Sequence, residues 1–316
     1  MINRKTTPMV VASYFAAIMV ILALLSNFVP FFVLIGFFLM PIPMVVLYMT
    51  YGLRWSIMAG AVAGILLGLF LQPILAVVQI LTFGSVGLLL GKGFKEEWAP
   101  FKMLSGVTFV LIVVNVAALM AMYAFLDMNL YQLMQQQVVA SSQALMEGYR
   151  ESGMSEVQLM EMQQQVNDMI KTIPTLLPLF FCIAVSIISY MNIKVTQLIL
   201  VKMGYPILPF LPMRYWEISR SMLYFYVLAM VVKYWGITRG IDWLTIAGLN
   251  LEQLSVFFIA VQGIAFVLYM IYKRTKLGVG MQIIVVVLLL LQPHLHFFAL
   301  IMGFFDMVLN YRKKRA

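Results

Sequence analysis

The sequence predicts an all-α protein, a polytopic bundle of transmembrane helices, and two observations support that prediction. Hydrophobic residues make up 63% of the chain and charged residues only 10%, whereas soluble domains usually contain about 25% charged residues. Long stretches also contain no Asp, Glu, Lys or Arg, and the first two cover 6–53 and 55–91. A surface so poor in charge needs lipid as its solvent, so we expect an integral membrane protein.

The charge-free stretches set the predicted crossings, because a transmembrane helix needs about 20 apolar residues. Polar residues and prolines divide the first two stretches, at Asn27 and Pro30 and again at Gln72 and Pro73. We predict eight crossings, at 9–26, 29–50, 55–71, 74–91, 104–126, 177–200, 217–236 and 253–272.

The apolar stretch 278–310 follows, with Gln292 and Pro293 at its middle. It could form one tilted helix, two short helices or a re-entrant hairpin. We favour a paired arrangement, because it keeps the four basic residues of 312–315 on the inner side.

Basic residues concentrate on one side of this topology. With the N-terminus inside, the outer segments contain only Arg150, Lys171, Lys233 and Arg239. The inner segments contain Arg4, Lys5, Arg54, Lys92, Lys95, Lys102, Lys194, Lys202, Arg214, Arg220, Lys273, Arg274 and Lys276. Cytoplasmic loops are enriched in Lys and Arg, so we expect a multi-pass protein of the bacterial cytoplasmic membrane with both termini cytoplasmic. The net charge of +9 then faces anionic lipid, and we expect no nucleic-acid partner.

We expect a single membrane domain over 1–316, comprising helices in 1–127, an insertion at 128–171 and C-terminal helices in 172–316. The insertion reads as an extracytoplasmic amphipathic helical hairpin, with Gly153 as a C-cap and a capping box from Ser155 and Gln158. It suits a lid or docking surface, or a plain αα-hairpin that lies on the bundle or among the lipid headgroups. Pro174 and Pro178 then mark the return to lipid, and the prolines of 202–220 favour an extended path along the inner interface.

Small residues at four-residue spacing mark close helix contacts. The clearest pattern is Gly60, Gly64 and Gly68 in the third crossing, and Ala12 and Ala16 repeat the spacing in the first. Packing within the bundle is the favoured interpretation, and a face for a partner subunit is the alternative.

Polar residues at membrane depth usually face the bundle interior, so they are the candidates for binding. We select Gln79, Asn115 and Gln262 as candidate solute-binding residues, and we expect Asp306 to form a structural ion pair beside the basic tail. The two histidines, His294 and His296, are poorly spaced for a metal on a helix. With no catalytic or cofactor motif in view, we expect neither enzymatic activity nor a metal or other cofactor.

The N-terminal half, about 8–127, resembles the membrane-embedded S components of energy-coupling-factor vitamin transporters. The resemblance rests on the order of Ala12 and Ala16, the segments 41–43 and 51–55, the glycines of the third crossing and the glycines from Gly84 to Gly93. It implies a protein that binds a small solute from outside and docks through Ala12 and Ala16 onto a T component driven by ATPases. The chain exceeds the six crossings of an S component.

The whole chain also resembles the YybS-like family of polytopic bacterial membrane proteins. The features are the 128–170 insertion, the segment 208–216 and the ending from Gly303 to Lys313. We therefore expect a transport-related, S-component-like protein that binds a small solute or a partner subunit. The alternative is a membrane scaffold or regulatory protein.

Overall fold

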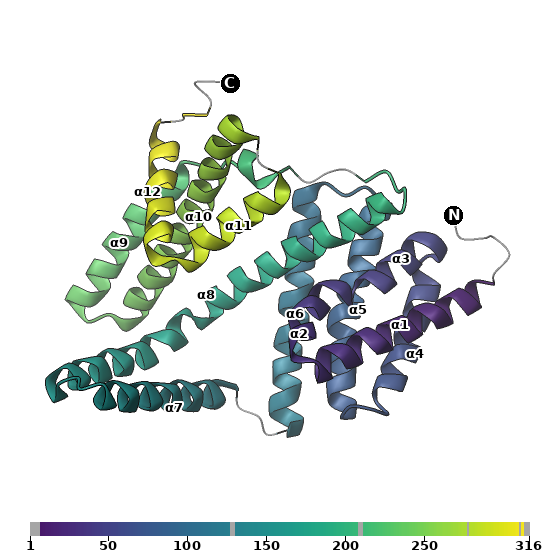
Figure 1. Ribbon diagram of the computed structural model, residues 1–316, viewed down its shortest axis with the longest axis horizontal. Helices are drawn as coiled ribbons and strands as arrows, with labels where there is room; N and C mark the ends of the chain where they lie inside the picture. The colour runs from purple at the N-terminus through teal and green to yellow at the C-terminus, as the bar shows by residue number, and fades with distance from the viewer. Residues whose placement is uncertain (1–6, 127–129, 208–210, 277, 310, 313–316) are drawn as a thin grey trace. The chain divides into compact units, whose positions relative to one another are not determined.

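The computed structural model describes residues 7–126, 130–207, 211–276, 278–309 and 311–312, and all regular elements in this part of the chain are helices. Figure 1 shows their arrangement within each part of the chain. The described helices fall into two compact units, one of 1–171 with 180–210 and the other of 172–179 with 211–316. Each unit is described by itself below, and the expectation of a single domain stays a prediction.

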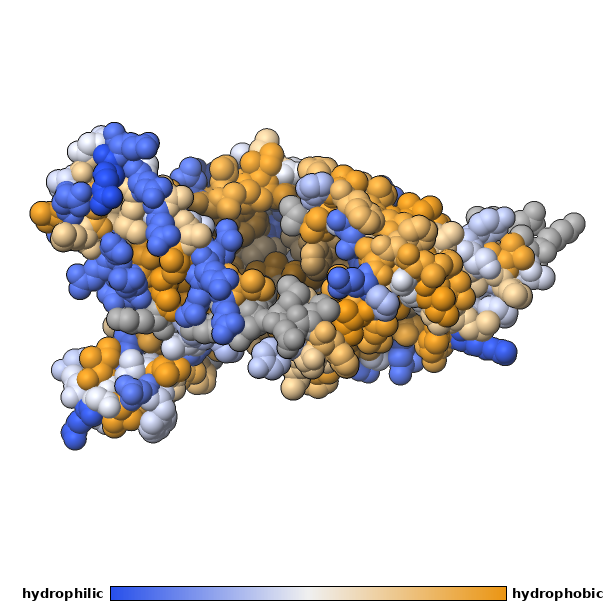
Figure 2. Space-filling model, turned by 90° about the horizontal axis from the view of Figure 1, so that it is seen from below, coloured by the Kyte–Doolittle hydropathy of each residue, from blue (hydrophilic) through white to orange (hydrophobic). Residues whose placement is uncertain are grey.

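The predicted class is confirmed, because many of these helices are long and apolar enough to cross a membrane. Among the described residues, seven spans meet that standard by length and composition: Pro8–Phe28, Pro30–Tyr51, Pro73–Lys95, Pro100–Phe125, Thr172–Lys202, Ser221–Arg239 and Asp242–Thr275. An eighth is possible if the bent pair Val279–Leu291 and Pro293–Leu309 makes one span. Figure 2 shows apolar side chains over much of the surface in view, as expected where lipid is the solvent.

Prolines begin most helices of the first unit. Five helices have proline in their first turn, where its missing N–H costs no hydrogen bond: α1 (Pro8–Phe28), α2 (Pro30–Leu39), α3 (Ile42–Tyr51), α5 (Pro73–Lys95) and α6 (Pro100–Leu126). The breaks predicted at Pro30 and Pro73 are therefore confirmed. Helix α4 (Leu53–Leu67) lies between α3 and α5 and begins without a proline.

The third predicted crossing, 55–71, is realised as a shorter helix. The left-handed Gly52, with φ of +88°, precedes α4, and α4 ends before Gly68 after 15 residues. That length is below the usual range for a crossing. The backbone turns at 68–71, and the next helix begins at Pro73. Residues 68–71 are apolar, so the sequence predicted that the helix would continue through them.

The small-residue pattern packs helices of the first unit together, as favoured by the sequence. A Cβ on Gly60 would lie 2.5 Å from Cε of Met44, and one on Gly91 would lie 2.6 Å from Cβ of Tyr48. Gly87 would similarly meet the carbonyl oxygen of Pro41 at 2.8 Å. The close approach of α3 to α5 therefore depends on Gly87 and Gly91 having no side chain, whereas the end of Met44 could move aside at Gly60.

The predicted helical hairpin is confirmed in its described residues. Helix α7 (Leu130–Glu151) ends before Gly153, whose φ is +86°, and α8 (Glu156–Lys202) follows. Both hydrogen bonds of the capping box between Ser155 and Gln158 are present. Residues 127–129 lie outside the described part of the chain.

Pro174 and Pro178, predicted to mark the return to lipid, lie inside α8, which continues through both and is 47 residues long. Each proline removes one N–H from the helix. Two carbonyl oxygens close to the prolines also accept side-chain hydrogen bonds: Thr175 Oγ1 donates to Thr172 O at 2.7 Å, and Asn250 Nδ2 donates to Thr175 O at 2.9 Å. Proline is tolerated inside membrane helices, and α8 is an example.

Apart from residues 172–179 of α8, the described part of the second unit contains a non-α-helical segment and four helices. Residues 211–220 form no α-helix and contain one short 3₁₀ turn, η1 (Met213–Tyr215), in agreement with the predicted irregular segment; 208–210 lie outside the described residues. The helices are α9 (Ser221–Arg239), α10 (Asp242–Thr275), α11 (Val279–Leu291) and α12 (Pro293–Leu309). Helices α11 and α12 meet at a bend of 103°, so the predicted pair of short helices is present.

Helices α9 and α10 of this unit pack through glycine. A Cβ on Gly236 would overlap the backbone of Thr245, and one on Gly248 would lie 2.5 Å from the backbone nitrogen of Lys233. An ion pair between Lys233 and Glu252 joins the same two helices. The result is a tight helical hairpin against which α12 also packs.

Candidate functional site

The candidate site forms where α10 crosses α12 in the second unit. A Cβ on Gly263 would overlap the carbonyl oxygen of Ala299, and a Cβ on Gly303 would overlap that of Ile259. The two backbones therefore touch at a pair of glycines, as in other small-residue helix crossings. Gln262 precedes the first glycine and Asp306 lies about one turn beyond the second, so the crossing brings these polar side chains together.

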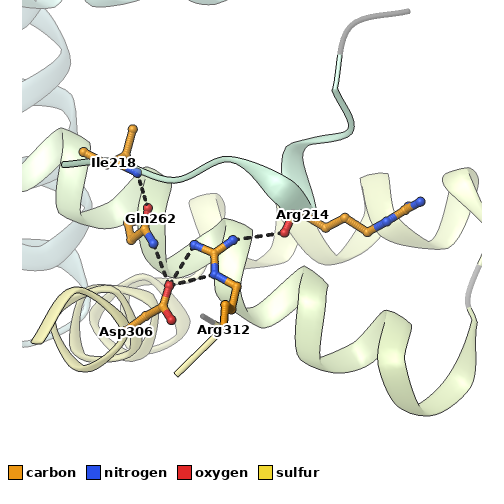
Figure 3. Close-up of polar contacts among 5 residues, drawn as sticks. All are labelled: Arg214, Ile218, Gln262, Asp306 and Arg312. Atoms are coloured by element: carbon orange, nitrogen blue, oxygen red, sulfur yellow. Dashed lines mark hydrogen bonds and ion pairs between the residues drawn. The ribbon is translucent and has the colours of Figure 1, made fainter. Parts of the chain in front are cut away.

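Gln262 and Arg312 converge on one oxygen of Asp306, as Figure 3 shows. Gln262 Nε2 donates to Oδ2 at 2.6 Å, and Arg312 donates to it from Nε at 2.9 Å and lies 2.7 Å away through Nη2. All three residues are buried: Gln262 and Asp306 are each 4% exposed, and Arg312 is 7% exposed. The predicted ion pair between Asp306 and the basic tail is confirmed, and Arg312 is its partner.

The same cluster holds the segment before α9. Gln262 Oε1 accepts a hydrogen bond from the Ile218 N–H at 2.7 Å, and Arg312 Nη1 donates to the carbonyl oxygen of Arg214 at 3.1 Å. Because Gln262 accepts on one side and donates on the other, its carboxamide has a single favourable orientation. The contacts link α10, α12, Arg312 and the irregular segment into one network.

Arg214 extends the network along α10. Its guanidinium carbon lies 3.8 Å from the ring centroid of Tyr272, and its Nη1 donates to Gln282 Oε1 at 3.4 Å. A guanidinium over an aromatic face is attracted by the negative charge of the ring face. This stacking helps to hold η1 in place. The carbonyl oxygen of Arg214, in η1, is the one that accepts the hydrogen bond from Arg312.

A cavity of about 500 Å³ lies beside the cluster. Its lining is mostly polar and includes both signs of charge: Glu217, Ile218, Ser219, Arg220, Gln262, Asp306, Met307 and Arg312. Sites for small molecules usually have volumes of about 300–1,000 Å³ with a few convergent polar groups. Ionisable residues buried in a membrane protein are costly and often mark binding or transport sites. The cavity can therefore accept a small polar molecule against a fixed carboxylate.

Comparison with family models gives one match, to the family described as "Predicted membrane protein (DUF2232)", over residues 17–307. The chain belongs to this family. Comparison with curated proteins and with solved structures gives no match. Membership in the DUF2232 family supports the membrane assignment over nearly the whole chain, from α1 to α12. The YybS-like and S-component resemblances stay predictions.

In this DUF2232 chain, Gln262 is the one of the three predicted binding residues that lies in the cluster. Gln79, on α5 of the first unit, accepts from Asn27 Nδ2 at 3.1 Å and donates to Met40 Sδ at 3.6 Å. The cleft beside Gln79 has a volume of only about 10 Å³, which is the space that one water molecule needs. Gln79 therefore makes structural hydrogen bonds, with no room for a solute beside it in this cleft.

Asn115 on α6 donates to the carbonyl oxygen of Leu111 in its own helix at 2.8 Å. Ala12 and Ala16 are 6% and 2% exposed. They belong to a core cluster with Ala59 and Ala63 of α4. In this conformation a partner could not reach either alanine, and their predicted role in docking stays a prediction.

Helix α8 has a buried polar face that was not predicted from the sequence. Ser189, Asn192 and Thr196 are each at most 2% exposed and lie in the first unit. Their spacing of three and four residues places them on one side of the helix, and that spacing was the signal that could have revealed them. Among the residues that the structure describes, no group of three or more His, Cys, Asp or Glu is placed to hold a metal ion.

Proposed function

We propose that this chain is a transport-related membrane protein that binds a small polar solute in the cavity beside Gln262 and Asp306. The observation that supports the proposal is the pairing of a cavity of about 500 Å³ with a buried, hydrogen-bonded carboxylate in its wall. A buried ion pair adds little stability over apolar packing. Its presence beside a cavity is better explained by recognition of a polar molecule than by folding alone.

A direct test fills the cavity from its exposed edge. Ser219 lines the cavity and is exposed, so Ser219→Trp adds bulk without replacing a buried residue. Ser219→Ala is the matched control, because it also removes the hydroxyl but leaves the space open. We expect small molecules that co-purify in mild detergent, detected by mass spectrometry, to be lost from Ser219→Trp and kept by Ser219→Ala. Identical small-molecule content in both variants, or none in the unaltered protein, would contradict solute binding.

The proposed setting is the bacterial cytoplasmic membrane with both termini inside. The distribution of Lys and Arg supports it, and it places the segment 211–220 and the cavity at the cytoplasmic face. The S-component resemblance adds an ATPase-driven membrane partner to the proposal. Co-purification with an ATPase module in the same detergent extract is the corresponding test, and a chain that purifies alone from native membranes would argue against it.

The hairpin supports a second candidate function, that of a membrane scaffold. Helix α7 carries exposed apolar side chains, among them Leu133 at 43% and Leu145 at 60% exposed, which suits a docking surface for a protein partner. Leu145→Glu should weaken cross-linking to that partner without lowering the melting temperature, and Ser142→Glu is the control on the same helix. Unchanged cross-linking in Leu145→Glu would count against the scaffold.

A further inference from the structure

We infer that α11 and α12 form a re-entrant hairpin whose tip, at residues 292–294, lies inside the bilayer and is reached by water from the outer side. The hairpin then lines the outer part of an aqueous passage for small polar solutes. This inference concerns a different part of the second unit from the cavity beside Asp306, and it does not depend on a ligand in that cavity.

The first argument concerns the two ends of the helix pair, which meet at one residue. Arg214 Nη1 donates to Oε1 of Gln282, in the first turn of α11, at 3.4 Å. The carbonyl oxygen of Arg214 accepts from Nη1 of Arg312, just beyond α12, at 3.1 Å. The guanidinium of Arg214 also stacks on Tyr272, near the end of α10. The start of α11 and the end of α12 therefore lie at the same end of the unit, so the pair is not a single crossing.

The second argument concerns length. Helix α11 has 13 residues, and at about 1.5 Å per residue it is about 20 Å long. The hydrocarbon core of a bilayer is about 30 Å thick, so a hairpin that enters from one face turns back before it reaches the other. Lys273, Arg274 and Lys276 precede α11 and assign its entry to the cytoplasmic face. The tip therefore lies in the outer part of the hydrocarbon.

The third argument concerns the polar groups at the tip. The side chains of Gln292 and His294 are exposed. Pro293 has no N–H, so the carbonyl oxygen of Leu289 loses the donor that a continuous helix would provide. At membrane depth, backbone outside a continuous helix occurs only where protein buries it or where it lines a water-filled cavity. Because the tip side chains are exposed, we assign water as the partner of these groups.

A second polar feature of the same unit lies at a similar depth. Lys233 and Glu252 form an ion pair between α9 and α10, and their side chains are 29% and 14% exposed. Lys233 lies 12 residues after Ser221, where α9 begins at the inner end, which corresponds to about 18 Å along the helix. Ionisable residues within membrane helices usually face the bundle interior or a water-filled cavity. Partly exposed charges at this depth therefore support hydration of the outer part of the unit.

The proposed role follows from the break in the helix pair. Broken helices that meet at membrane depth form the solute and ion sites of many transporters, and their irregular backbone lines a cavity. The bend of 103° between α11 and α12 is such a break. Its polar side chains face water in our assignment, so the tip is the part of the hairpin that a passing solute would meet.

Cysteine accessibility in the full-length protein tests the inference, in a Cys182→Ser background. Gln292→Cys and His294→Cys each place a thiol at the tip, where exposed side chains should be replaceable without a change in melting temperature. Met230→Cys is the matched control, because Met230 is exposed at 47% but lies in the middle of the crossing helix α9. The probes are a small impermeant maleimide and a bulky polyethylene-glycol maleimide, and labelling after denaturation shows that each thiol can react.

We expect the small maleimide to label both tip variants in intact cells, from the side opposite to Lys276→Cys. The bulky maleimide should leave the tip unlabelled, because the tip is recessed. Ser152→Cys, between α7 and α8, should react with both reagents. Met230→Cys should react with neither before denaturation, since maleimides attack the thiolate and a thiol in lipid does not ionise.

The other outcomes overturn the inference. Labelling of the tip by the bulky maleimide as fast as Ser152→Cys would place the tip outside the bilayer. Labelling from the same side as Lys276→Cys, or no labelling of either tip variant, would remove the outer passage. Equal labelling of Met230→Cys and the tip would show that the tip is no more hydrated than a lipid-facing surface. A tip labelled as expected supports the inference whether or not a solute binds beside Asp306.

Discussion

Nε2 of Gln262 lies 2.6 Å from Oδ2 of Asp306, so a buried carboxamide on α10 meets a buried carboxylate on α12. This contact lies next to the point where the two helices cross at their glycines. The oxygen of the same carboxamide, Oε1, accepts a hydrogen bond from the Ile218 N–H. One side chain thus couples the helix crossing to the segment that borders the cavity.

Replacing Gln262 by Leu should destabilise the protein because it leaves the Ile218 N–H without its partner and removes one donor from Asp306. A buried polar group left unsatisfied costs about 1–3 kcal/mol, so the total loss should be about 2–5 kcal/mol. The melting temperature in detergent measures it. Gln253→Leu on the same helix is the control. An equal loss of melting temperature in the two variants would show that the hydrogen-bond network around Gln262 does not contribute to stability.

The ion pair between Asp306 and Arg312 should show strong non-additivity. Removing one member of a buried pair costs about 3–5 kcal/mol, whereas replacing both by apolar residues is often close to neutral. We expect Arg312→Leu and Asp306→Leu to lower the unfolding free energy more individually than together. Chemical unfolding of the unaltered protein, the two single variants and the double variant gives the double-mutant cycle. Additive losses of unfolding free energy would argue that the two charges do not depend on each other.

Gly303→Ala should push α12 away from α10, because the new Cβ would overlap the carbonyl oxygen of Ile259. Overpacking of this kind typically costs about 1–3 kcal/mol. Gly280→Ala is the matched control, because a Cβ there meets nothing within 4 Å, and relief of glycine flexibility should make it neutral or slightly stabilising. The melting temperatures of both variants test this prediction. An unchanged melting temperature in Gly303→Ala would refute the close crossing.

Ala12→Leu and Ala16→Leu together should lower the stability of the first unit, because both alanines are buried against the α4 side of the core cluster. Ser13→Leu, on the exposed side of α1, should have little effect on the melting temperature. If the alanine variant keeps its melting temperature and loses a partner instead, the docking role implied by the S-component resemblance gains support over packing.

Membrane orientation can be read from cysteine labelling, since Cys182 is the single cysteine of the chain. In a Cys182→Ser background, we expect Ser152→Cys to react with an impermeant maleimide from outside intact cells. Lys276→Cys should react only after the cells are permeabilised. Each position serves as the control for the other, and the reverse pattern would invert the proposed topology.

The membrane class and most helix positions could be predicted because apolar length and proline placement are local properties. The shortened α4 and the continuous α8 could not, since the apolar composition extends through 68–71 and two helix-breaking prolines lie at 174 and 178. Asn250, which donates to Thr175 O near Pro174 and Pro178, lies 75 residues from that carbonyl. No window of sequence around the prolines contains it.

The site was predictable only in part for the same reason. Gln262 and Asp306 each stood out as polar residues in apolar surroundings, but their sequence separation of 44 residues conceals their contact. Arg312 was part of a basic cluster whose members look alike in sequence. The structure describes Arg312 of that cluster, and its guanidinium reaches the buried carboxylate beside the crossing of α10 and α12.

The link between Arg312 and the carbonyl oxygen of Arg214 spans 98 residues, and this distance bears on the order in which the protein assembles. Closing a long loop costs entropy before any contact is made, and contacts between distant residues form slowly. The adjacent helices α9 and α10 need no such closure, so we expect them to pair early. The cavity beside Asp306 then takes shape as one of the last events of folding.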